Sequence, residues 1–381
     1  MKLVCVSHAC VVRSNQAFFA HVAELTGWDV TIVLPLDWRN ELGTFRADRW
    51  PGFAGALEPL HVVGRGRIPL HVYAARMGKL LRRIEPDVVY VHNEPYALAT
   101  LQGFAAARRL PVGFYTAQNV LKRYPPPFSL FERWVYRRAS FAFPTSEEVL
   151  AVLRSKGYQG PATVLPLAVD LDALGSPAMT TAPTGDGLVV GFVGRLVPEK
   201  GVETLLDALA LAPVSVRAVI AGAGAHADLL RSRAVALGIA DRVEWRGYVP
   251  HEKLSRVYRE LDLLVVPSRT TGAWREQFGR VVIEALAVGV PVLASASGSL
   301  PGLVAQTGGG WTFPEGDASE LAARLRTLLE DRAALREAAT KGRAAVERSF
   351  GLSAVASVFA AAIEEATGRV VRSSLAPAGA S

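Results

Sequence analysis

Two glutamates eight positions apart carry the strongest chemical signal in the 381-residue sequence. Glu276 precedes a Phe278-Gly279 step, and Glu284 lies in the apolar helical pattern that follows. A glycine lets a ligand approach the backbone, and a helix N-terminus favours phosphate. At about 1.5 Å per residue, Glu284 stands roughly 8 Å from the helix start. The spacing suits one carboxylate on a sugar hydroxyl and one on a ribose, with a diphosphate between them. Two unrelated surface acids are the alternative, which the apolar neighbours of Glu284 disfavour.

A second signal is a pair of cations between a strand-like run and a helical pattern. Gly194 ends the run, and Arg195 and Lys200 follow it. Both cations could reach one diphosphate, the arginine through its planar fork and the lysine as a point charge. The alternative is an ordinary loop with solvated charges. Gly222 and Gly224 follow the next strand-like run, and they permit either close approach of a flat base or phosphate, or simply a tight turn.

The elements that position these residues alternate between strands and helices along the whole chain. The predicted strands are Lys2–Ser7, Asp29–Leu34, Asp87–Val91, Pro111–Tyr115, Ser140–Phe143, Leu188–Val193, Val216–Ala221, Val243–Trp245, Asp262–Val266 and Pro291–Ala294. The predicted helices are Ser14–Thr26, His71–Ile84, Pro95–Arg109, Phe128–Arg138, Lys200–Leu211, Ala225–Leu237, Pro250–Glu260 and Gly279–Val288. Nearly continuous apolar strands between helices predict an α/β fold with parallel sheets covered on both faces.

The chain divides into two such units. Around Gly175–Gly187 the composition turns to Gly, Pro, Thr and Ser, which predicts a linker. We expect a Rossmann-like N-terminal domain over residues 1–175 and a Rossmann-like C-terminal domain over 176–351, with a helix at about 352–372 packing back on the first. Thr145 and Glu148 have the spacing of a capping box. Such domains turn the carboxyl ends of their strands toward one cleft, where ligands of open α/β sheets bind.

In combination and order, these motifs resemble those of family 4 glycosyltransferases, which have the GT-B fold. The resemblance covers essentially the whole chain, and its second-half motifs are specific in their spacing. In the second half it rests on the Arg195–Lys200 loop, the Gly222–Gly224 turn, Pro267-Ser268 and the glutamate pair. In the first half it rests on the segments Pro86–His92, Tyr115–Asn119, Ser146–Glu148 and Pro166–Asp170.

The resemblance implies a retaining transfer from a nucleotide-diphosphate sugar, with no metal and no other cofactor. It gives Arg195 and Lys200 the role of holding the diphosphate and stabilising its leaving charge. It implies that Glu276 binds the hydroxyls of the donor sugar, helped by the amides of the Phe278-Gly279 step, and that Glu284 binds the hydroxyls of the ribose. Stabilisation of the leaving group by preplaced cations and N–H groups is the largest effect that such a site can offer.

Two departures from the family pattern stand out. The family often has a Gly-Gly step after the first strand, whose amides face the diphosphate; here the segment Val12–Gln16 takes its place, and Ser14 is expected to cap the next helix. Gln118 stands where the family often has a histidine, and a glutamine cannot shuttle protons. Imidazole catalysis is therefore excluded at that position. Front-face attack, in which the leaving phosphate takes the acceptor's proton, remains compatible with the change.

Polar side chains of the first half are weaker candidates for contacts with the donor or acceptor. They are His8, Asn15, His92, Glu94, Gln118 and Asn119. Glu94 could orient the acceptor hydroxyl or act as a base, or it could simply favour the N-terminus of the next helix. Asp170 and Asp172 match the DxD pattern of metal-dependent glycosyltransferases of another fold, but they precede the linker, and we interpret them as structural.

Positive charge is concentrated in the half to which the resemblance assigns the acceptor. The chain has a net charge of +7, and residues 60–140 alone contain 13 basic and 4 acidic residues, a net of +9. The stretches 65–83 and 122–138 mix cations with Tyr, Trp and Phe, as interfacial membrane binding requires. We expect a lipid-linked or cell-surface saccharide acceptor and docking on an anionic membrane. An Arg-rich solvated surface with inward-packed aromatics is the alternative.

Composition limits the location and the competing functions. No apolar run reaches the roughly 18–20 residues of a membrane span. Met1–Ser7 resembles a first strand more than a signal peptide, and Cys5 and Cys10 cannot form a disulfide framework. We expect a cytoplasmic protein of polysaccharide biosynthesis, peripheral on the cytoplasmic face of the membrane. The alternatives are an epimerase-like sugar-nucleotide enzyme, a phosphorylase, a transferase with a small soluble acceptor, and a non-catalytic binder. No nucleic-acid-binding motif accompanies the basic stripe.

Overall fold

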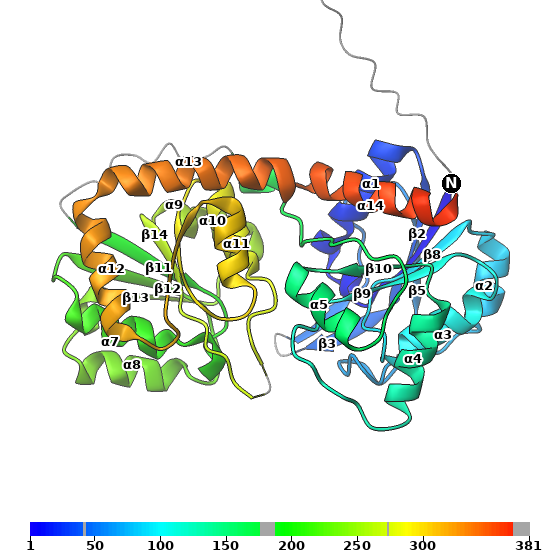
Figure 1. The fold of residues 1–381 in the computed structure, drawn as a ribbon, viewed down its shortest axis with the longest axis horizontal. Coiled ribbons are helices and arrows are strands. Elements are labelled where there is room, and N and C mark those ends of the chain that lie inside the picture. Colours follow the sequence, from blue (N-terminus) through cyan, green and yellow to red (C-terminus); the bar gives the residue numbers. More distant parts are fainter. Residues whose placement is uncertain (41–42, 176–186, 273, 369–381) are drawn as a thin grey trace, which may run out of the picture.

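A computed structural model describes residues 1–40, 43–175, 187–272 and 274–368 of the chain. It contains two six-stranded sheets, one in each half, and every strand pair in them is parallel. Helices cover the sheets, and the carboxyl ends of the strands face the region between the halves (Figure 1). This architecture confirms the predicted α/β fold of the GT-B type.

The N-terminal sheet has the order β10-β9-β8-β1-β2-β5, so the direction of the strand order reverses beside β1. Its strands are β1 (Lys2–Val6), β2 (Asp29–Pro35), β5 (Ala56–Leu60), β8 (Val88–Val91), β9 (Val112–Thr116) and β10 (Phe141–Pro144). Its helices are α1 (Ala17–Thr26), α2 (Met77–Ile84), α3 (Leu98–Ala107), α4 (Phe128–Arg138), α5 (Glu147–Ser155) and α6 (Leu171–Leu174). Two small hairpins join β3 (Asp37–Asn40) to β4 (Gly43–Arg46) and β6 (Val62–Val63) to β7 (Val72–Tyr73).

The C-terminal sheet has the order β13-β12-β11-β14-β15-β16, with the reversal beside β11. Its strands are β11 (Leu188–Val193), β12 (Val216–Ala221), β13 (Val243–Gly247), β14 (Leu263–Val266), β15 (Val292–Ser295) and β16 (Gly310–Phe313). Its helices are α7 (Val202–Leu211), α8 (Ala227–Ala236), α9 (Leu254–Arg259), α10 (Arg280–Ala287), α11 (Leu300–Thr307), α12 (Ala318–Glu330) and α13 (Arg332–Ser349). Ligand sites of open α/β sheets lie at such reversals, so both point to the same region.

The last helix, α14 (Leu352–Thr367), returns the chain to the N-terminal half and packs against α1 (Figure 1). Phe359 is fully buried and its ring lies 5.4 Å from that of Phe18 and 5.0 Å from that of Phe143. Where the chain returns, Val169 bonds to the backbone of Phe350 and Leu352, so the two connections between the halves lie side by side. The predicted linker falls largely in residues 176–186, outside the described part of the chain.

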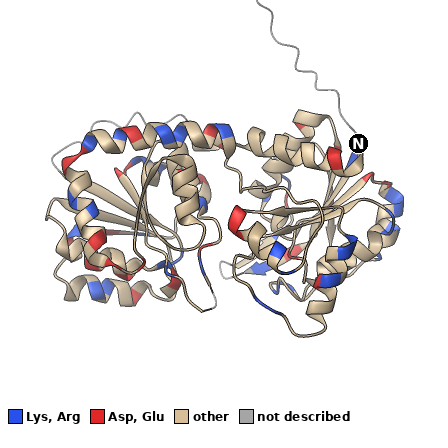
Figure 2. Ribbon diagram, viewed as in Figure 1, with Lys and Arg blue, Asp and Glu red and all other residues tan. Residues whose placement is uncertain are grey.

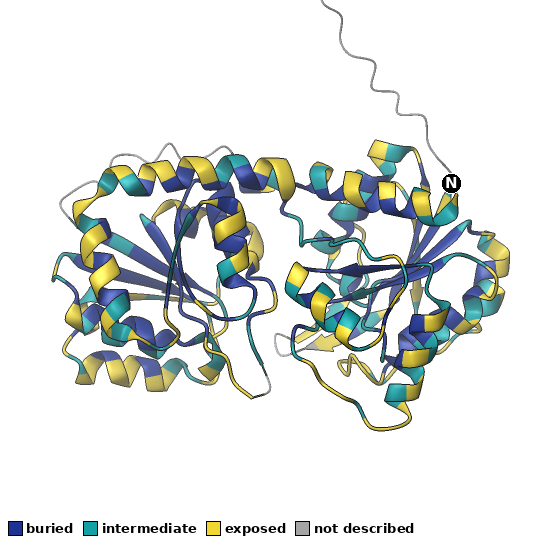
Figure 3. Cartoon of the chain, viewed as in Figure 1, coloured by how far each residue is buried: buried dark blue, intermediate teal, exposed yellow. Residues whose placement is uncertain are grey.

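Charged side chains lie mainly on the helices and loops around the sheets, whereas the strands are mostly buried (Figures 2 and 3). Each sheet is packed against its helices through buried aliphatic and aromatic residues, in two clusters per half. None of the described helices is long and apolar enough to cross a bilayer.

Three local predictions are wrong. The predicted helix His71–Ile84 is helical only from Met77, because residues 72–73 form β7. Helix α5 is capped by Ser146, whose hydroxyl accepts a hydrogen bond from the amide of Val149, and not by Thr145. Ser14 does not cap α1 through its side chain, because it lies in a preceding 3₁₀ turn. In each case a tertiary contact or a local turn replaced the simple sequence pattern.

Candidate active site

Glu276 and Lys200 form a largely buried ion pair between two strand ends of the C-terminal sheet. Lys200 Nζ lies 2.6 Å from Glu276 Oε2, and the hydroxyl of Ser268 donates to the same oxygen at 2.9 Å. The ammonium also lies 4.9 Å from the ring centre of Trp274. The side chains are only 10% and 20% exposed for the glutamate and the lysine. A buried carboxylate requires such partners, so these two predicted residues share one electrostatic site.

Arg195, the other predicted cation, is not part of this pair. Its side chain is half exposed, and its guanidinium lies 3.8 Å from the carboxylate of Glu199. The nearby glycines are required by packing. A Cβ on Gly222 would lie 1.9 Å from the carbonyl oxygen of Gly194, and one on Gly224 would lie 2.3 Å from that of Leu196. The tight-turn interpretation of these glycines is therefore sufficient to explain them.

Gly279 and Glu284 belong to α10 and its start. Gly279 has a φ of 81° at the N-cap, a conformation that side chains rarely adopt. Glu284 is buried, and its carboxylate accepts a hydrogen bond of 2.8 Å from the hydroxyl of Tyr258. Its other oxygen lies 3.0 Å from His251 Nε2. This hydrogen bond raises the pKa of His251, and burial raises that of Tyr258.

Polar contacts join the loop that carries Glu276 to the N-terminal half. Asn119 Nδ2 donates to the backbone carbonyl of Glu276 at 2.7 Å. The carboxylate of Glu148 accepts from Arg275 at 3.1 Å and from the hydroxyl of Ser299 at 3.0 Å. We call the contacts made by Asn119, Glu148, Arg275 and Ser299 the bridging contact. It fixes the backbone of Glu276 from one half while Lys200 holds its side chain from the other.

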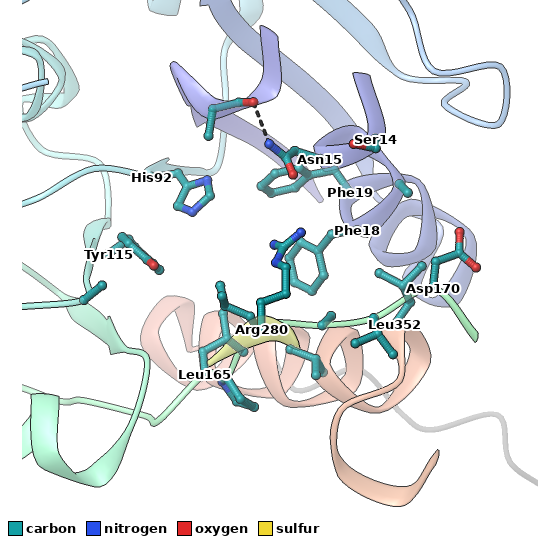
Figure 4. Close-up of a pocket in the computed structure, with 18 of the residues that line it drawn as sticks. Ser14, Asn15, Phe18, Phe19, His92, Tyr115, Leu165, Asp170, Arg280 and Leu352 are labelled. Atoms are coloured by element: carbon teal, nitrogen blue, oxygen red, sulfur yellow. Dashed lines mark hydrogen bonds between the residues drawn. The ribbon is translucent and has the colours of Figure 1, made fainter. Parts of the chain in front are cut away.

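A cavity of about 740 Å³ lies between the two halves (Figure 4). Among the predicted residues, its lining includes His8, Asn15, His92, Glu94 and Glu284. The lining does not include Arg195, Lys200 or Glu276, nor the other predicted donor residues Gly194, Gly222, Gly224, Phe278 and Gly279. The structure therefore separates the predicted residues into a group around the Lys200–Glu276 pair and a group around the cavity. Of the residues predicted to bind the donor, Glu284 lines the cavity.

The histidines of the cavity are held by neighbouring rings. His8 lies 4.9 Å from Trp38 and 5.3 Å from His71, measured between ring centres. Burial, helped by the charges of His71 and His92, lowers the pKa of His8 to about 3, so its ring is neutral near pH 7. His92 Nδ1 lies 3.1 Å from the hydroxyl of Ser7. This contact fixes the orientation of the ring but not its tautomer. A neutral imidazole such as that of His8 can hydrogen-bond a hydroxyl.

Glu94 and Gln118 are occupied by the chain itself. The Glu94 carboxylate accepts from the hydroxyl of Thr116 at 2.7 Å and from the amide of Ala117 at 2.8 Å, and burial raises its pKa. Gln118 donates to Tyr124 and accepts from Lys156, both at 2.8 Å. Both side chains hold loops of the N-terminal half in place; the partners of Glu94 lie at the end of β9 and not at the start of the next helix, as the structural alternative had it.

Asn15 and Asp170 are both hydrogen-bonded to nearby backbone groups. Asn15 donates through its side chain to the carbonyl of Ala9 at 2.8 Å and lines the cavity. Asp170 accepts from the amide of Ala173 and caps α6, as a structural role requires. The described residues contain no group of three or more His, Cys, Asp or Glu side chains placed to hold a metal ion.

The bridging contact predicts a test of the interdomain arrangement. Replacing Glu148 with Ala leaves Arg275 without its carboxylate acceptor, and Ser299 with only the carbonyl of Gln277. Hydrogen bonds to charged groups contribute about 1.5–3 kcal/mol each, so we expect the closed arrangement to lose about tenfold or more in population. Small-angle X-ray scattering would record a larger radius of gyration. Glu147→Ala, which removes the exposed neighbouring carboxylate, is the matched control and should leave the radius unchanged. Equal radii for both variants would contradict the role of Glu148.

The contact between His251 and Glu284 predicts a pH dependence. Since the folded-state pKa of His251 is raised, its stabilising contribution is fully present below its unfolded pKa, about 6.5, and is lost as the pH rises through the higher folded value. NMR titration should show the pKa of His251 falling toward its ordinary value in Glu284→Gln. Glu252→Gln should lower it less, because Glu252 is the smallest of the causes that raise it. A His251 pKa that Glu284→Gln leaves unchanged would refute the assignment.

Comparison with known proteins identifies the family on both halves of the chain. The model "Glycosyltransferase Family 4" matches residues 19–173, and the model "Glycosyl transferases group 1" matches residues 181–345. The chain is 28% identical to 2-deoxystreptamine glucosyltransferase of Streptomyces kanamyceticus, over 76% of this chain and 80% of that protein. It is 39% identical to D-inositol 3-phosphate glycosyltransferase of Mycobacteroides abscessus, over 49% of this chain and 42% of that protein. The match thus spans less than half of the length of the second relative.

Solved structures agree on the fold. Sucrose-phosphate synthase of Thermosynechococcus elongatus superposes with a TM-score of 0.75 at 20% identity, covering 96% of this chain and 98% of that one. HepE of Anabaena, in complex with UDP, gives the same TM-score and identity, covering 96% of this chain and all of that one. With a family model on each half and the same two-sheet architecture, the chain belongs to the family 4 glycosyltransferases of the GT-B fold.

Proposed function

We propose that this glycosyltransferase moves a sugar from a nucleotide-diphosphate sugar to a hydroxyl of an acceptor, with retention of configuration and without a metal. The observation that carries the proposal is the Lys200–Glu276 pair beside the start of α10, with Glu284 one and a half turns further along that helix. A diphosphate at the helix start would meet cations and free N–H groups together. The two carboxylates would then lie on either side of it.

The ion pair explains how the site stays stable before the donor binds. Lys200 and Glu276 satisfy each other's charge in a largely buried place. A diphosphate offers Lys200 a stronger negative partner, and Arg195, half exposed on the same loop, can turn toward it. Glu276 is then released to accept hydrogen bonds from the sugar hydroxyls. The donor therefore exchanges one set of satisfied charges for another, which limits the desolvation cost of binding.

The transfer step uses electrostatics rather than a protein base. As the bond to the anomeric carbon breaks, negative charge grows on the diphosphate, and Arg195, Lys200 and the amides after Phe278 stabilise it. The acceptor hydroxyl attacks the same face and gives its proton to the leaving phosphate. No side chain needs to shuttle that proton, which agrees with Gln118 being held by Tyr124 and Lys156. Glu284, oriented by Tyr258 and His251, would hold the ribose.

Two alternatives remain for the same site. An epimerase-like enzyme would convert or hydrolyse the donor with no gain from any acceptor. A transferase with a small soluble acceptor would show turnover without lipid. The relatives named above act on 2-deoxystreptamine and on inositol 3-phosphate by their names, and HepE has been solved with UDP and with UDP-glucose. A donor screen by thermal stabilisation and hydrolysis, starting from UDP-glucose, identifies the sugar nucleotide before acceptors are tried.

Two substitutions test the donor site. Glu276→Gln should lower turnover by about a hundredfold or more, because it removes a group that acts on the reacting sugar, with little change in melting temperature. Lys200→Ala should weaken the binding of the nucleotide diphosphate about tenfold or more in titration calorimetry, because a charged partner of the phosphate is lost. Arg217→Gln, an exposed site on β12, is the control. An unchanged affinity in Lys200→Ala removes that residue from the site, and full activity of folded Glu276→Gln rejects its role.

We also propose a lipid-linked saccharide acceptor reached from an anionic membrane surface, which would make the protein peripheral on the cytoplasmic face. Two loops support this proposal. The carbonyl of Pro69 accepts from the amide of Leu98, and the ring of Tyr96, beside that helix start, lies 4.2 Å from the ring of Tyr124. The loops 65–70 and 121–124 therefore flank the same helix start, and the first of them borders the cavity through Ile68 and Pro69.

The exposed groups on these loops are aliphatic and basic rather than aromatic. Ile68, Leu70 and Leu121 on the loops are more than 40% exposed, as is Leu130 of the neighbouring helix α4. Arg67, Lys122 and Arg123 are exposed beside them, and Lys and Arg also mark α2 and α4 (Figure 2). Tyr73 and Tyr136 are buried, so for these two the inward-packed alternative holds. Leucine and isoleucine can enter the interface while the cations meet anionic headgroups.

Vesicle binding tests this docking. The protein should bind phosphatidylglycerol vesicles at low salt and release them as salt rises, because attraction to anionic headgroups contributes about 1 kcal/mol per cation. Lys122→Glu with Arg123→Glu should weaken binding about tenfold or more. The matched pair Arg217→Glu with Arg336→Glu, both exposed in the C-terminal half, should not. Equal binding to phosphatidylcholine vesicles, or no binding at low salt, would refute electrostatic docking.

A further inference from the structure

One cation of the cavity has no hydrogen-bonded or ion-paired partner among the described residues. Arg280 is the first residue of α10, and its guanidinium enters the cavity toward Phe18 and His92 of the N-terminal half (Figure 4). No described residue forms an ion pair or a hydrogen bond with it. Arg13, the other arginine of the lining, has a loose partner in Asp48 at 3.7 Å. Arg280 is thus the unpaired positive charge among the described lining residues.

The carboxylates of the cavity are already engaged elsewhere. Glu94 is held by Thr116 and Ala117, and Glu284 by Tyr258 and His251. Asp170 caps α6 through the amide of Ala173. The fourth, Glu252, is exposed and acts on the charge of its neighbour His251. None of these carboxylates is bonded to Arg280, which is exposed and is therefore hydrated until a ligand fills the cavity.

A second donor faces the same space. Asn93 is only 4% exposed and lines the cavity, and its side-chain nitrogen has no hydrogen-bond partner in the described structure. Its oxygen is used by the amide of Glu94, at 2.9 Å, so the amide group is oriented with its N–H bonds free. A buried N–H group without a partner is costly, and a ligand oxygen would satisfy it.

We propose that Arg280 and Asn93 recognise a negatively charged oxygen group, a phosphate or carboxylate, on the acceptor. A ligand that fills the cavity removes water from the guanidinium, which is unfavourable unless the ligand supplies an anion. A planar guanidinium and a free amide N–H that line one cavity both suit such an oxyanion. An acceptor carrying amino groups would place like charges together and be rejected. The inference rests on the proposed function and adds the charge class of the acceptor to it.

The donor diphosphate is the rival source of the anion. Arg195 and Lys200, the cations proposed for it, are absent from the cavity lining, whereas His8, Asn15 and His92 of the acceptor half belong to that lining with Arg280. Glu284, proposed for the ribose, shares this lining, so the donor also reaches the cavity, and the assignment of Arg280 to the acceptor rests on the N-terminal residues that line the cavity with it. It makes a distinct prediction, because a donor role would change the affinity for the nucleotide and an acceptor role would not.

The first test uses inorganic phosphate as the probe on the full chain saturated with UDP, so that the donor site is filled. Titration calorimetry should show phosphate binding to the wild type, at least tenfold weaker binding to Arg280→Gln, and intermediate binding to Arg280→Lys. Asn93→Asp, which keeps the shape and adds a negative charge, should also weaken it. Arg217→Gln should have no effect. Absence of phosphate binding in the wild type, or equal binding in Arg280→Gln, overturns the inference.

The second test separates the two anion sources and the two hypotheses. UDP affinity should stay within about twofold in Arg280→Gln; a loss as large as that of Lys200→Ala would assign Arg280 to the donor and overturn the inference. Hydrolysis of the donor by water reports transferase chemistry with no acceptor present, so its absence counts against the proposed function alone. With hydrolysis established, myo-inositol, a myo-inositol phosphate and a diamino-cyclitol are compared as competitors of hydrolysis. The phosphate should compete at least tenfold better, in the wild type only; preference for the amine overturns the inference.

Discussion

The position of Glu276 is the constraint on which the rest of the site depends. Its side chain is held by Lys200 and Ser268 of the C-terminal half, while its backbone carbonyl accepts from Asn119 of the N-terminal half. Glu276 is therefore hydrogen-bonded to both halves at once. A shift of the N-terminal half would move the carbonyl, and a change of the charges around Lys200 would release the carboxylate. If the donor diphosphate binds at Lys200 as proposed, its binding and the relative position of the halves would be coupled through this single loop.

The bridging contact explains why the loop needs no secondary structure of its own. The segment before α10 is irregular, yet Arg275 is held by Glu148, and the Ser299 amide donates to the Glu276 carbonyl. A Cβ on Gly298 would lie 2.0 Å from that carbonyl, so the next loop packs directly against it. Irregular backbone placed in this way is rigid enough to position a reacting group, which is how loops on an α/β scaffold carry function.

The sequence predicted what depends on local pattern and missed what depends on tertiary contact. Apolar runs identified the inner strands, but β5 and β16, both at sheet edges and only partly buried, lack a clear apolar pattern. The motifs assigned Lys200 and Glu276 to one donor site, but their ion pair was not predicted. That of Glu148 with Arg275, 127 positions apart, had no sequence signal beyond the Ser146–Glu148 segment. Likewise, only the structure shows that Tyr124 and Lys156 are hydrogen-bonded to the side chain of Gln118.

The net charge of the chain hides two separate distributions of charge, one on the outer surface and one in the cavity. The excess of the N-terminal half lies on its outer loops and helices, where it suits a surface, whereas the cavity contains almost none of it. Inside the cavity the decisive charge comes from Arg280 of the nearly neutral C-terminal half. In the proposal for Arg280, acceptor recognition depends on the same helix that begins beside Glu276. Because the cavity is lined by both halves, the proposed acceptor site would need both of them in the arrangement seen here.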